Sequence, residues 1–129
     1  MVMNRNGDLI ALLGRVLLSA IFISGGWGKL MNPAGAIQTI AHYGLPFPKI
    51  TYAITVLFEL GGGLAVLIGL RSRWAALALA VFCFATAFAV HYQPADRMQM
   101  INFWKNLAMA GGFLQIVAWG AGRWSLDRR

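Results

Sequence analysis

Four long apolar segments, separated by short polar joints, dominate the sequence. An α-helix needs about 20 mostly apolar residues to cross the hydrocarbon core of a bilayer, and each segment is close to that length. The hydrophobic content of 59% and the mean hydropathy of +0.64 also exceed what is usual for soluble domains. The sequence therefore predicts an all-α integral membrane protein. The segments run roughly from Leu9 to Ile23 and on through "SGGWGKL", from Ile50 to Leu70, from Trp74 to Tyr92, and from Ile101 to Gly122.

The joints between these segments predict how the helices are connected. "LRSR" separates the second and third segments, and "QPADRMQM" separates the third and fourth. Short joints place neighbouring helices antiparallel, so we expect a compact four-helix bundle. The length of 129 residues is that of a single domain, and we interpret residues 1–129 as one transmembrane domain.

The joint between the first and second segments is longer and less membrane-like. It reads "NPAGAIQTIAHYGLP", with Asn32 as an N-cap and Pro33 at the first helical position. Gly44 and Pro46 are stop signals. The sequence thus predicts a short extra helix from Pro33 to about Tyr43, too short to span, which carries His42 to the outer mouth of the bundle.

The formal net charge of +7 raises the question of nucleic-acid binding. The basic residues are scattered among apolar spans instead of gathered on a soluble face, so we do not expect a nucleic-acid partner. By the positive-inside rule, the larger basic load marks the cytoplasmic side and predicts that both termini are cytoplasmic. That side would hold Arg5, Arg71, Arg73, Arg123, Arg128 and Arg129, whereas Lys29, Lys49, Arg97 and Lys105 lie on or towards the other.

Glu59 carries a formal charge in the middle of the second segment. An unpaired carboxylate in hydrocarbon is costly, so something must hold it. Helical phase puts Tyr52, Thr55 and Gly63 on the same face, and polar stripes of this kind turn inward together in a membrane bundle. Similar stripes on the first and fourth segments carry Arg15, Ser19, Gly26 and Lys29, and Asn102, Lys105, Asn106 and Met109. We hypothesise that Glu59 is held by Arg15, by Lys105 or by both.

Two interpretations of this charged core are open. It can be an ionic staple that only fixes helix packing, or it can be part of a ligand site. Three inward-facing cations, Arg15, Lys29 and Lys105, outnumber one carboxylate, so the outer part of the cavity would suit an anion or electron-rich carbonyl oxygens. His91 and His42 end their helices on the outer side and are candidates for a proton relay. With only two histidines near the rim, haem is not favoured.

The remaining residues exclude some kinds of chemistry. Cys83 is the only cysteine, so the chain by itself cannot form an internal dithiol pair, and core packing is the expected role. The sequence contains no G-x-x-x-x-G-K-[ST], G-x-G-x-x-G or H-E-x-x-H motif, so no metal site is expected. Trp27 and Trp104 lie near span ends, where they either anchor in the membrane interface or flank a flat ring.

The second segment carries a stripe of small residues that favours close packing against another helix. Gly61, Ala65 and Gly69 are spaced by four residues, which lets another helix approach closely. That helix belongs either to this bundle or to a second protomer, so a homo-oligomer is left open.

The order of motifs along the chain resembles that of the DoxX family of small four-helix bacterial inner-membrane proteins. The motifs are "LGRVLLSAIFISGGWGKL", "HYGLPFP", "FELGGGLAVLIGLRSR", "VHYQP", "FWKNLAMAGG" and "GAGRWSLD". The resemblance implies a multi-pass inner-membrane location, an association with quinone handling and oxidative stress, and partners in membrane oxidoreductase complexes. Carried over residue by residue, the polar positions of the family fall on Arg15, Lys29, Glu59, His91, Lys105 and Asn106.

Two functional hypotheses follow, and the sequence leaves open whether the protein is an enzyme. In the first, a quinone or similar small ring compound binds in the polar cavity, with Lys105, Lys29 or His91 donating hydrogen bonds and Glu59 handling a proton. Asn106, Asn102, His42, Trp27 and Trp104 complete the candidate set. In the second, the protein is a non-catalytic membrane subunit whose helix faces or basic tail recruit a protein of a redox or stress-response complex. A transporter ranks third, because four spans make a small pathway.

Overall fold

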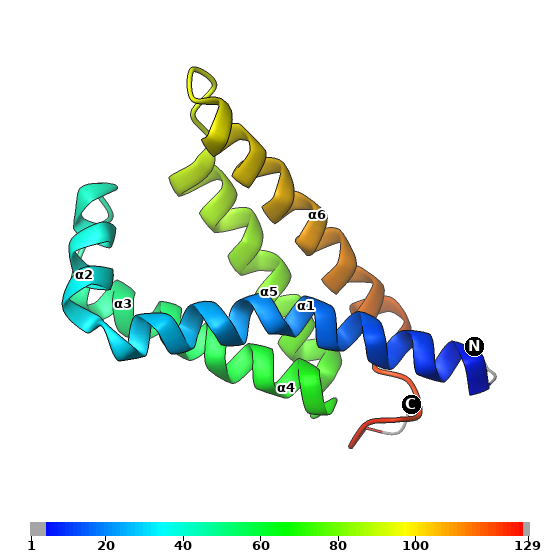
Figure 1. Cartoon of the computed structure of the whole chain (residues 1–129). Helices are drawn as coiled ribbons and strands as arrows, with labels where there is room; N and C mark the ends of the chain where they lie inside the picture. Colours follow the sequence, from blue (N-terminus) through cyan, green and yellow to red (C-terminus); the bar gives the residue numbers. More distant parts are fainter. Residues whose placement is uncertain (1–4, 128–129) are drawn as a thin grey trace.

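The computed structural model describes residues 5–127, and these residues form helices and loops without a strand (Figure 1). Two of the long helices contain a π-helical stretch, one in its middle and one at its end, so the described residues form four long helical rods and one short helix. This confirms the predicted all-α bundle with an extra helix between the first two spans. The elements are α1 (Arg5–Met31), α2 (Pro33–His42), α3 (Pro48–Val56), η1 (Leu57–Gly62), α4 (Gly63–Ile68), α5 (Ser72–Thr86), η2 (Ala87–His91) and α6 (Arg97–Trp119).

Three of the rods are both long and apolar enough to cross a membrane: Arg5–Met31, Pro48–Ile68 and Ser72–His91. The fourth expected span, α6, is 23 residues long but is not among them. Asn102, Lys105 and Asn106 lower its hydropathy. All three lie in the N-terminal half of α6, beside the segment where its partner α5 continues as η2.

Close helix approaches in the core depend on glycine. A Cβ atom on Gly26 of α1 would lie 2.7 Å from Leu60 Cγ, and one on Gly63 would lie 2.9 Å from Ile23 Cγ1. Gly62 meets Leu79 of α5 at 3.0 Å in the same way. Gly61 of the expected small-residue stripe is exposed, and inside the bundle the adjacent Gly62 and Gly63 make the close contacts. The core around them contains Phe22, Val66, Leu79, Phe113 and, as predicted, Cys83.

The start of α1 and the last described residues lie at the same end of the bundle. The backbone N–H of Leu126 donates to the carbonyl of Ile68 (3.0 Å), and that of Arg123 donates to Asp8 (3.3 Å). The C-terminal tail, residues 120–127, thus packs across the α4–α5 joint and the start of α1 (Figure 1). Arg128 and Arg129, which contribute to the predicted basic load, lie outside the described residues.

Arg15 ties this end of the bundle together. Its guanidinium group donates to the carbonyl oxygens of Val66 (3.0 Å) and Leu67 (2.6 Å) at the end of α4, and to that of Trp124 in the tail. A cation is favourable there because the last carbonyls of a helix carry partial negative charge. Arg15 is only 2% exposed. It therefore acts as a structural clamp between α1, α4 and the tail.

The opposite end of the bundle, called the outer end here after the predicted orientation, is open. The α5–η2 rod and α6 lean away from α1 towards this end, and α2 stands across the opening (Figure 1). As predicted, α2 begins with Asn32, whose side chain accepts a hydrogen bond from Gly35 N (3.2 Å). The candidate site lies in this opening.

Candidate functional site

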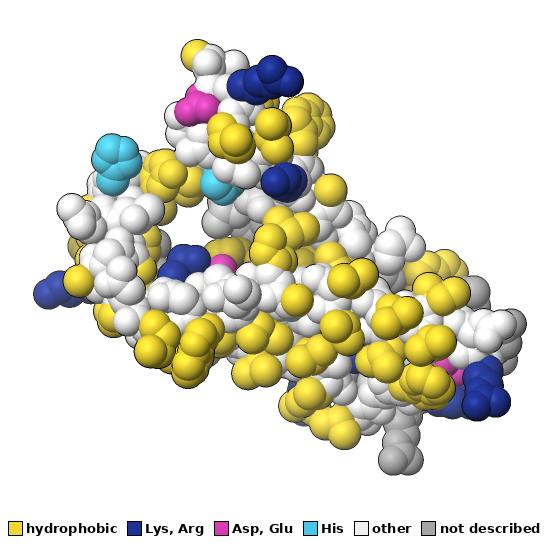
Figure 2. Space-filling view, in the orientation of Figure 1, with side chains coloured by type: hydrophobic (Ala, Val, Ile, Leu, Met, Phe, Trp, Pro, Cys, Tyr) yellow, Lys and Arg dark blue, Asp and Glu magenta, His cyan; other side chains and the backbone are white. Residues whose placement is uncertain are grey.

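A cavity of about 290 Å³ lies between the outer ends of the rods. Figure 2 shows the opening as a hollow with a basic and an acidic group at its floor and a histidine on each rim. Apolar side chains such as Phe22, Ile40 and Phe82 form much of the wall, and a few polar groups converge on it. Small-molecule sites have this pattern, apolar walls with a few placed polar groups, and volumes of roughly 300–1,000 Å³. The cavity has the size for a single-ring compound.

Glu59 and Lys29 form an ion pair at the floor of this cavity. Lys29 Nζ lies 2.7 Å from Glu59 Oε1, and Glu59 is 7% exposed. An ammonium nitrogen at this distance from a carboxylate oxygen forms a salt bridge, which joins α1 to η1. The hypothesis that Arg15 or Lys105 holds Glu59 is thus wrong. Arg15 is engaged at the other end of the bundle, and Lys105 is exposed on α6.

The register of α1 explains the choice of partner. Gly25 lies level with Glu59, and a Cβ atom there would lie 2.9 Å from Glu59 Oε2. Lys29 follows one turn later and reaches back to the carboxylate. Arg15 is ten residues from Gly25, which is about 15 Å along a helix and beyond the reach of its side chain.

Two of the rods that line the cavity depart from regular α-helix beside it. The π-helical segment η1 contains Glu59, and η2 ends at His91. A π-helical turn inserts extra backbone and changes the direction of the side chains, and such turns occur frequently at functional sites. They place the carboxylate and the imidazole on the two sides of the opening.

The wall opposite the ion pair carries a chain of hydrogen-bonding side chains. His91 Nδ1 lies 2.7 Å from Gln99 Oε1, and Gln99 Nε2 donates to the hydroxyl of Tyr43 (3.2 Å). Deeper in the cavity, Asn106 Nδ2 donates to Thr86 Oγ1 (2.9 Å). These contacts join the residue after α2, the α5–η2 rod and α6, and the bond to Gln99 fixes the orientation of the imidazole ring.

A second hollow, of about 550 Å³, adjoins the cavity along α6. The two share Ile21, His91, Asn106 and Met109 in their linings. The side hollow also contains Asn102 and Lys105. Since Ile21 and Lys105 are exposed, the side hollow opens outward between α1 and α6.

The structure brings together only part of the predicted set. Lys29, Glu59, His91 and Asn106 line the cavity, whereas Asn102 and Lys105 line the side hollow. The other four candidates, Arg15, His42, Trp27 and Trp104, do not line the cavity within the described residues.

Four polar residues of the site were not singled out from the sequence: Thr39, Tyr43, Thr86 and Gln99. Tyr43 stands within the quoted motif "HYGLPFP", but its contact with Gln99 depends on where α2 folds. Thr86 carries no charge, and Gln99 lies in the first turn of α6, so helical phase alone did not distinguish them.

Comparison with known proteins agrees with this architecture. The family model DoxX matches residues 10–92. The chain is 38% identical over 126 residues to inner membrane protein YqjF of Escherichia coli K12, covering 98% of this chain and 95% of that protein. It is 33% identical to inner membrane protein YphA of the same organism, covering 94% and 90%. An uncharacterized membrane protein of Mycobacterium tuberculosis, Rv3486, is 30% identical over 89% and 77%.

No solved structure matches the chain. The family match covers α1 to η2, the elements that carry Lys29, Glu59 and His91. With the curated relatives aligned over nearly the whole chain, these matches show that the protein belongs to the DoxX family.

Proposed function

We propose that this protein binds a quinone, or a similar small ring compound with polar oxygens, in the outer cavity as part of a redox-associated role. The observation that carries the proposal is the convergence of the Lys29–Glu59 pair and the His91–Gln99–Tyr43 chain on one largely apolar hollow. An apolar wall with polar groups on two sides is complementary to a flat ring that carries oxygens at opposite edges.

Each polar group has a definite role in this proposal. Lys29 Nζ donates a hydrogen bond to a ligand oxygen while it neutralises Glu59. Glu59 lines the cavity beside Lys29, and its carboxylate is the group that would accept a proton from a ligand hydroxyl. The imidazole of His91, held by Gln99, contacts the opposite edge of the ring.

In this proposal a hydrophobic ligand enters the cavity from the bilayer through the side hollow. A quinone with an isoprenoid tail dissolves in the bilayer and does not reach the site through water. The hollow beside Lys105 shares four lining residues with the cavity and opens between α1 and α6. The ring would enter sideways from the membrane, and the tail would remain in the opening.

A cavity-filling variant tests the proposal. Val90 lines the cavity from η2, and Val90→Trp should occupy the space of the ring. Wild-type protein in detergent is expected to melt at a higher temperature when ubiquinone-1 is added, since a ligand stabilises the state it binds. Val90→Trp should lose this rise. Thermal melts with and without ubiquinone-1 and menadione measure it.

Ala89→Trp is the matched control, because Ala89 lies in the same segment but is exposed. It should keep the ligand-dependent rise. If wild type shows no shift with either quinone, or if both variants keep it, the quinone interpretation fails. The non-catalytic scaffold hypothesis would then be the better account of the charged core.

The proposal also includes an orientation in the inner membrane, the location named for the two Escherichia coli relatives. The end that holds both termini carries Arg5, Arg71, Arg73 and Arg123, so the positive-inside rule makes it cytoplasmic. A reporter active only in the cytoplasm should work when fused after Arg129. Inserted near Gln93, in the η2–α6 loop, it should be inactive. The reverse pattern of activity would invert the orientation and place the cavity on the cytoplasmic side.

A further inference from the structure

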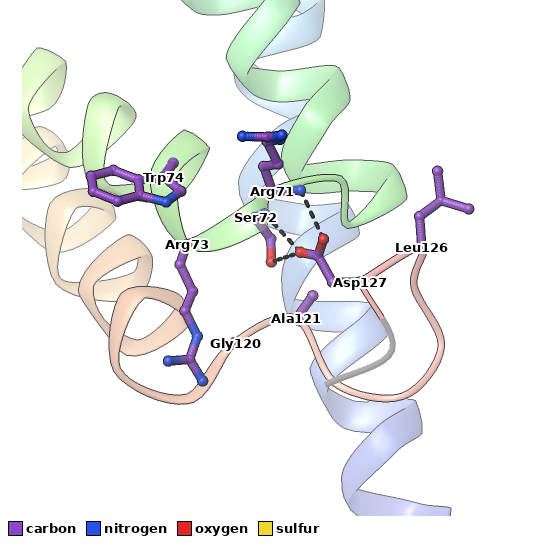
Figure 3. Close-up of a pocket in the computed structure, with 8 residues that line it drawn as sticks. All are labelled: Arg71, Ser72, Arg73, Trp74, Gly120, Ala121, Leu126 and Asp127. Atoms are coloured by element: carbon purple, nitrogen blue, oxygen red, sulfur yellow. Dashed lines mark hydrogen bonds between the residues drawn. The ribbon is translucent and has the colours of Figure 1, made fainter.

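A separate hollow of about 430 Å³ lies at the end of the bundle that holds the C-terminal tail (Figure 3). Its lining shares no residue with the outer cavity. The start of α5 contributes Arg71, Arg73 and Trp74, and the tail contributes Leu126 and Asp127. The three side chains from α5 and its joint are exposed, so a ligand at the membrane surface can reach them.

The hollow has an excess of positive charge. Asp127 is the acidic residue in its lining, and its carboxylate accepts hydrogen bonds from the backbone N–H of Arg71 (2.8 Å), and from the backbone N–H (2.8 Å) and hydroxyl (2.6 Å) of Ser72. These bonds cap the start of α5. Within residues 5–127, neither the Arg71 nor the Arg73 guanidinium group forms an ion pair. Figure 3 shows the two groups extending to either side of Ser72, with Arg73 beside the chain at Gly120.

The depth of the hollow is set by the helices on either side. The joint that contains Arg71 connects two membrane-spanning helices, Pro48–Ile68 and Ser72–His91. It therefore lies where the hydrocarbon ends and the lipid head groups begin. Trp74 and Leu126 are 73% and 64% exposed at the same level. Tryptophan favours this interface, with its ring against the lipid.

We infer that this hollow binds the phosphodiester head group of an acidic phospholipid. Guanidinium groups bind phosphate oxygens through paired N–H donors, and the exposed side chains of Arg71 and Arg73 can each turn towards a head group that lies between them. Trp74 and Leu126 contact the glycerol and the first part of the acyl chains. A free phosphate ion would use only the arginines, whereas an amphipathic lipid uses both halves of the hollow. Because the head group touches both the joint and the tail, its binding holds the tail on the bundle.

The experiment compares lipids and variants in thermal melts of the purified full-length protein. Phosphatidylglycerol added to detergent micelles is expected to raise the melting temperature by several degrees, whereas phosphatidylcholine should not. The double variant Arg71→Gln/Arg73→Gln should lose this rise. It should fold normally, because Asp127 bonds to the backbone of Arg71 and not to its side chain.

Arg123→Gln is the control, since Arg123 is an exposed arginine in the same tail that does not line the hollow. It should keep the full rise. An equal loss in Arg123→Gln would show that only general surface charge matters, and an unchanged rise in the double variant would remove the site. If glycerol 3-phosphate alone reproduces the rise, the hollow binds a soluble phosphate and the lipid assignment is overturned.

Discussion

Arg15→Met is expected to lower the free energy of unfolding by about 3 kcal/mol, the largest effect of any arginine in the chain. Methionine keeps much of the side-chain volume of arginine, but it leaves the carbonyl oxygens of Val66, Leu67 and Trp124 without their hydrogen-bond donor. Hydrogen bonds from a charged donor contribute about 1.5–3 kcal/mol each to stability. The net loss is smaller than their sum, because the variant no longer buries a charge, which itself costs free energy. Unfolding in mild detergent, followed by helical circular dichroism, measures the loss.

Arg123→Met is the matched control, because it makes the same chemical change at an exposed position of the same tail. Exposed substitutions usually change stability by less than about 0.5 kcal/mol. The free energy of unfolding of Arg15→Lys should lie between those of wild type and Arg15→Met, since one ammonium group cannot replace the several N–H donors of a guanidinium group. Equal stability of Arg15→Met and wild type would show that the clamp does not hold the tail.

Lys29→Met should be more destabilising than Glu59→Gln, although the two changes break the same ion pair. The side chain of Glu59 is 10% exposed and that of Lys29 is 33% exposed. Losing Lys29 leaves a buried carboxylate without a counter-ion, which costs about 3–5 kcal/mol. Losing the Glu59 charge leaves a lysine that can extend towards water, so the cost is smaller. Melting of both single variants and the double variant in detergent gives the coupling energy.

The double variant is expected to lose less stability than the sum of the two singles, because the residues are in contact. Lys105→Met is the control, since it removes an exposed lysine from the same outer half of the bundle. Its effect should add to that of Glu59→Gln. If Lys105 couples to Glu59 and Lys29 does not, the observed pairing is wrong.

Much of the fold could be predicted from local pattern. The long apolar segments correspond to the four rods, and the Asn32–Pro33 signal correctly marks the start of α2. Helical phase also identified Glu59 and Arg15 as buried, because a polar residue inside an apolar helix must turn away from lipid. These features depend on neighbours within a few residues along the chain, which the sequence contains.

The sequence by itself therefore determined an all-helical membrane bundle and the inward-turned faces of its first two spans, whereas Lys105 of the fourth expected span, predicted to face inward, is exposed. Only the tertiary structure decided which of those faces meet, and at what height. Glycines at positions 25, 26 and 63 let α1 pack closely against the η1–α4 part of the second rod. In this register Lys29 pairs with Glu59, and Arg15 lies at the end of α4 and donates to its carbonyl oxygens. The helical periodicity of a sequence shows towards which side of its own helix a residue points. It does not show how far one helix is shifted along its axis relative to another. That offset is fixed by the packing of small residues across the interface, which follows from the whole fold.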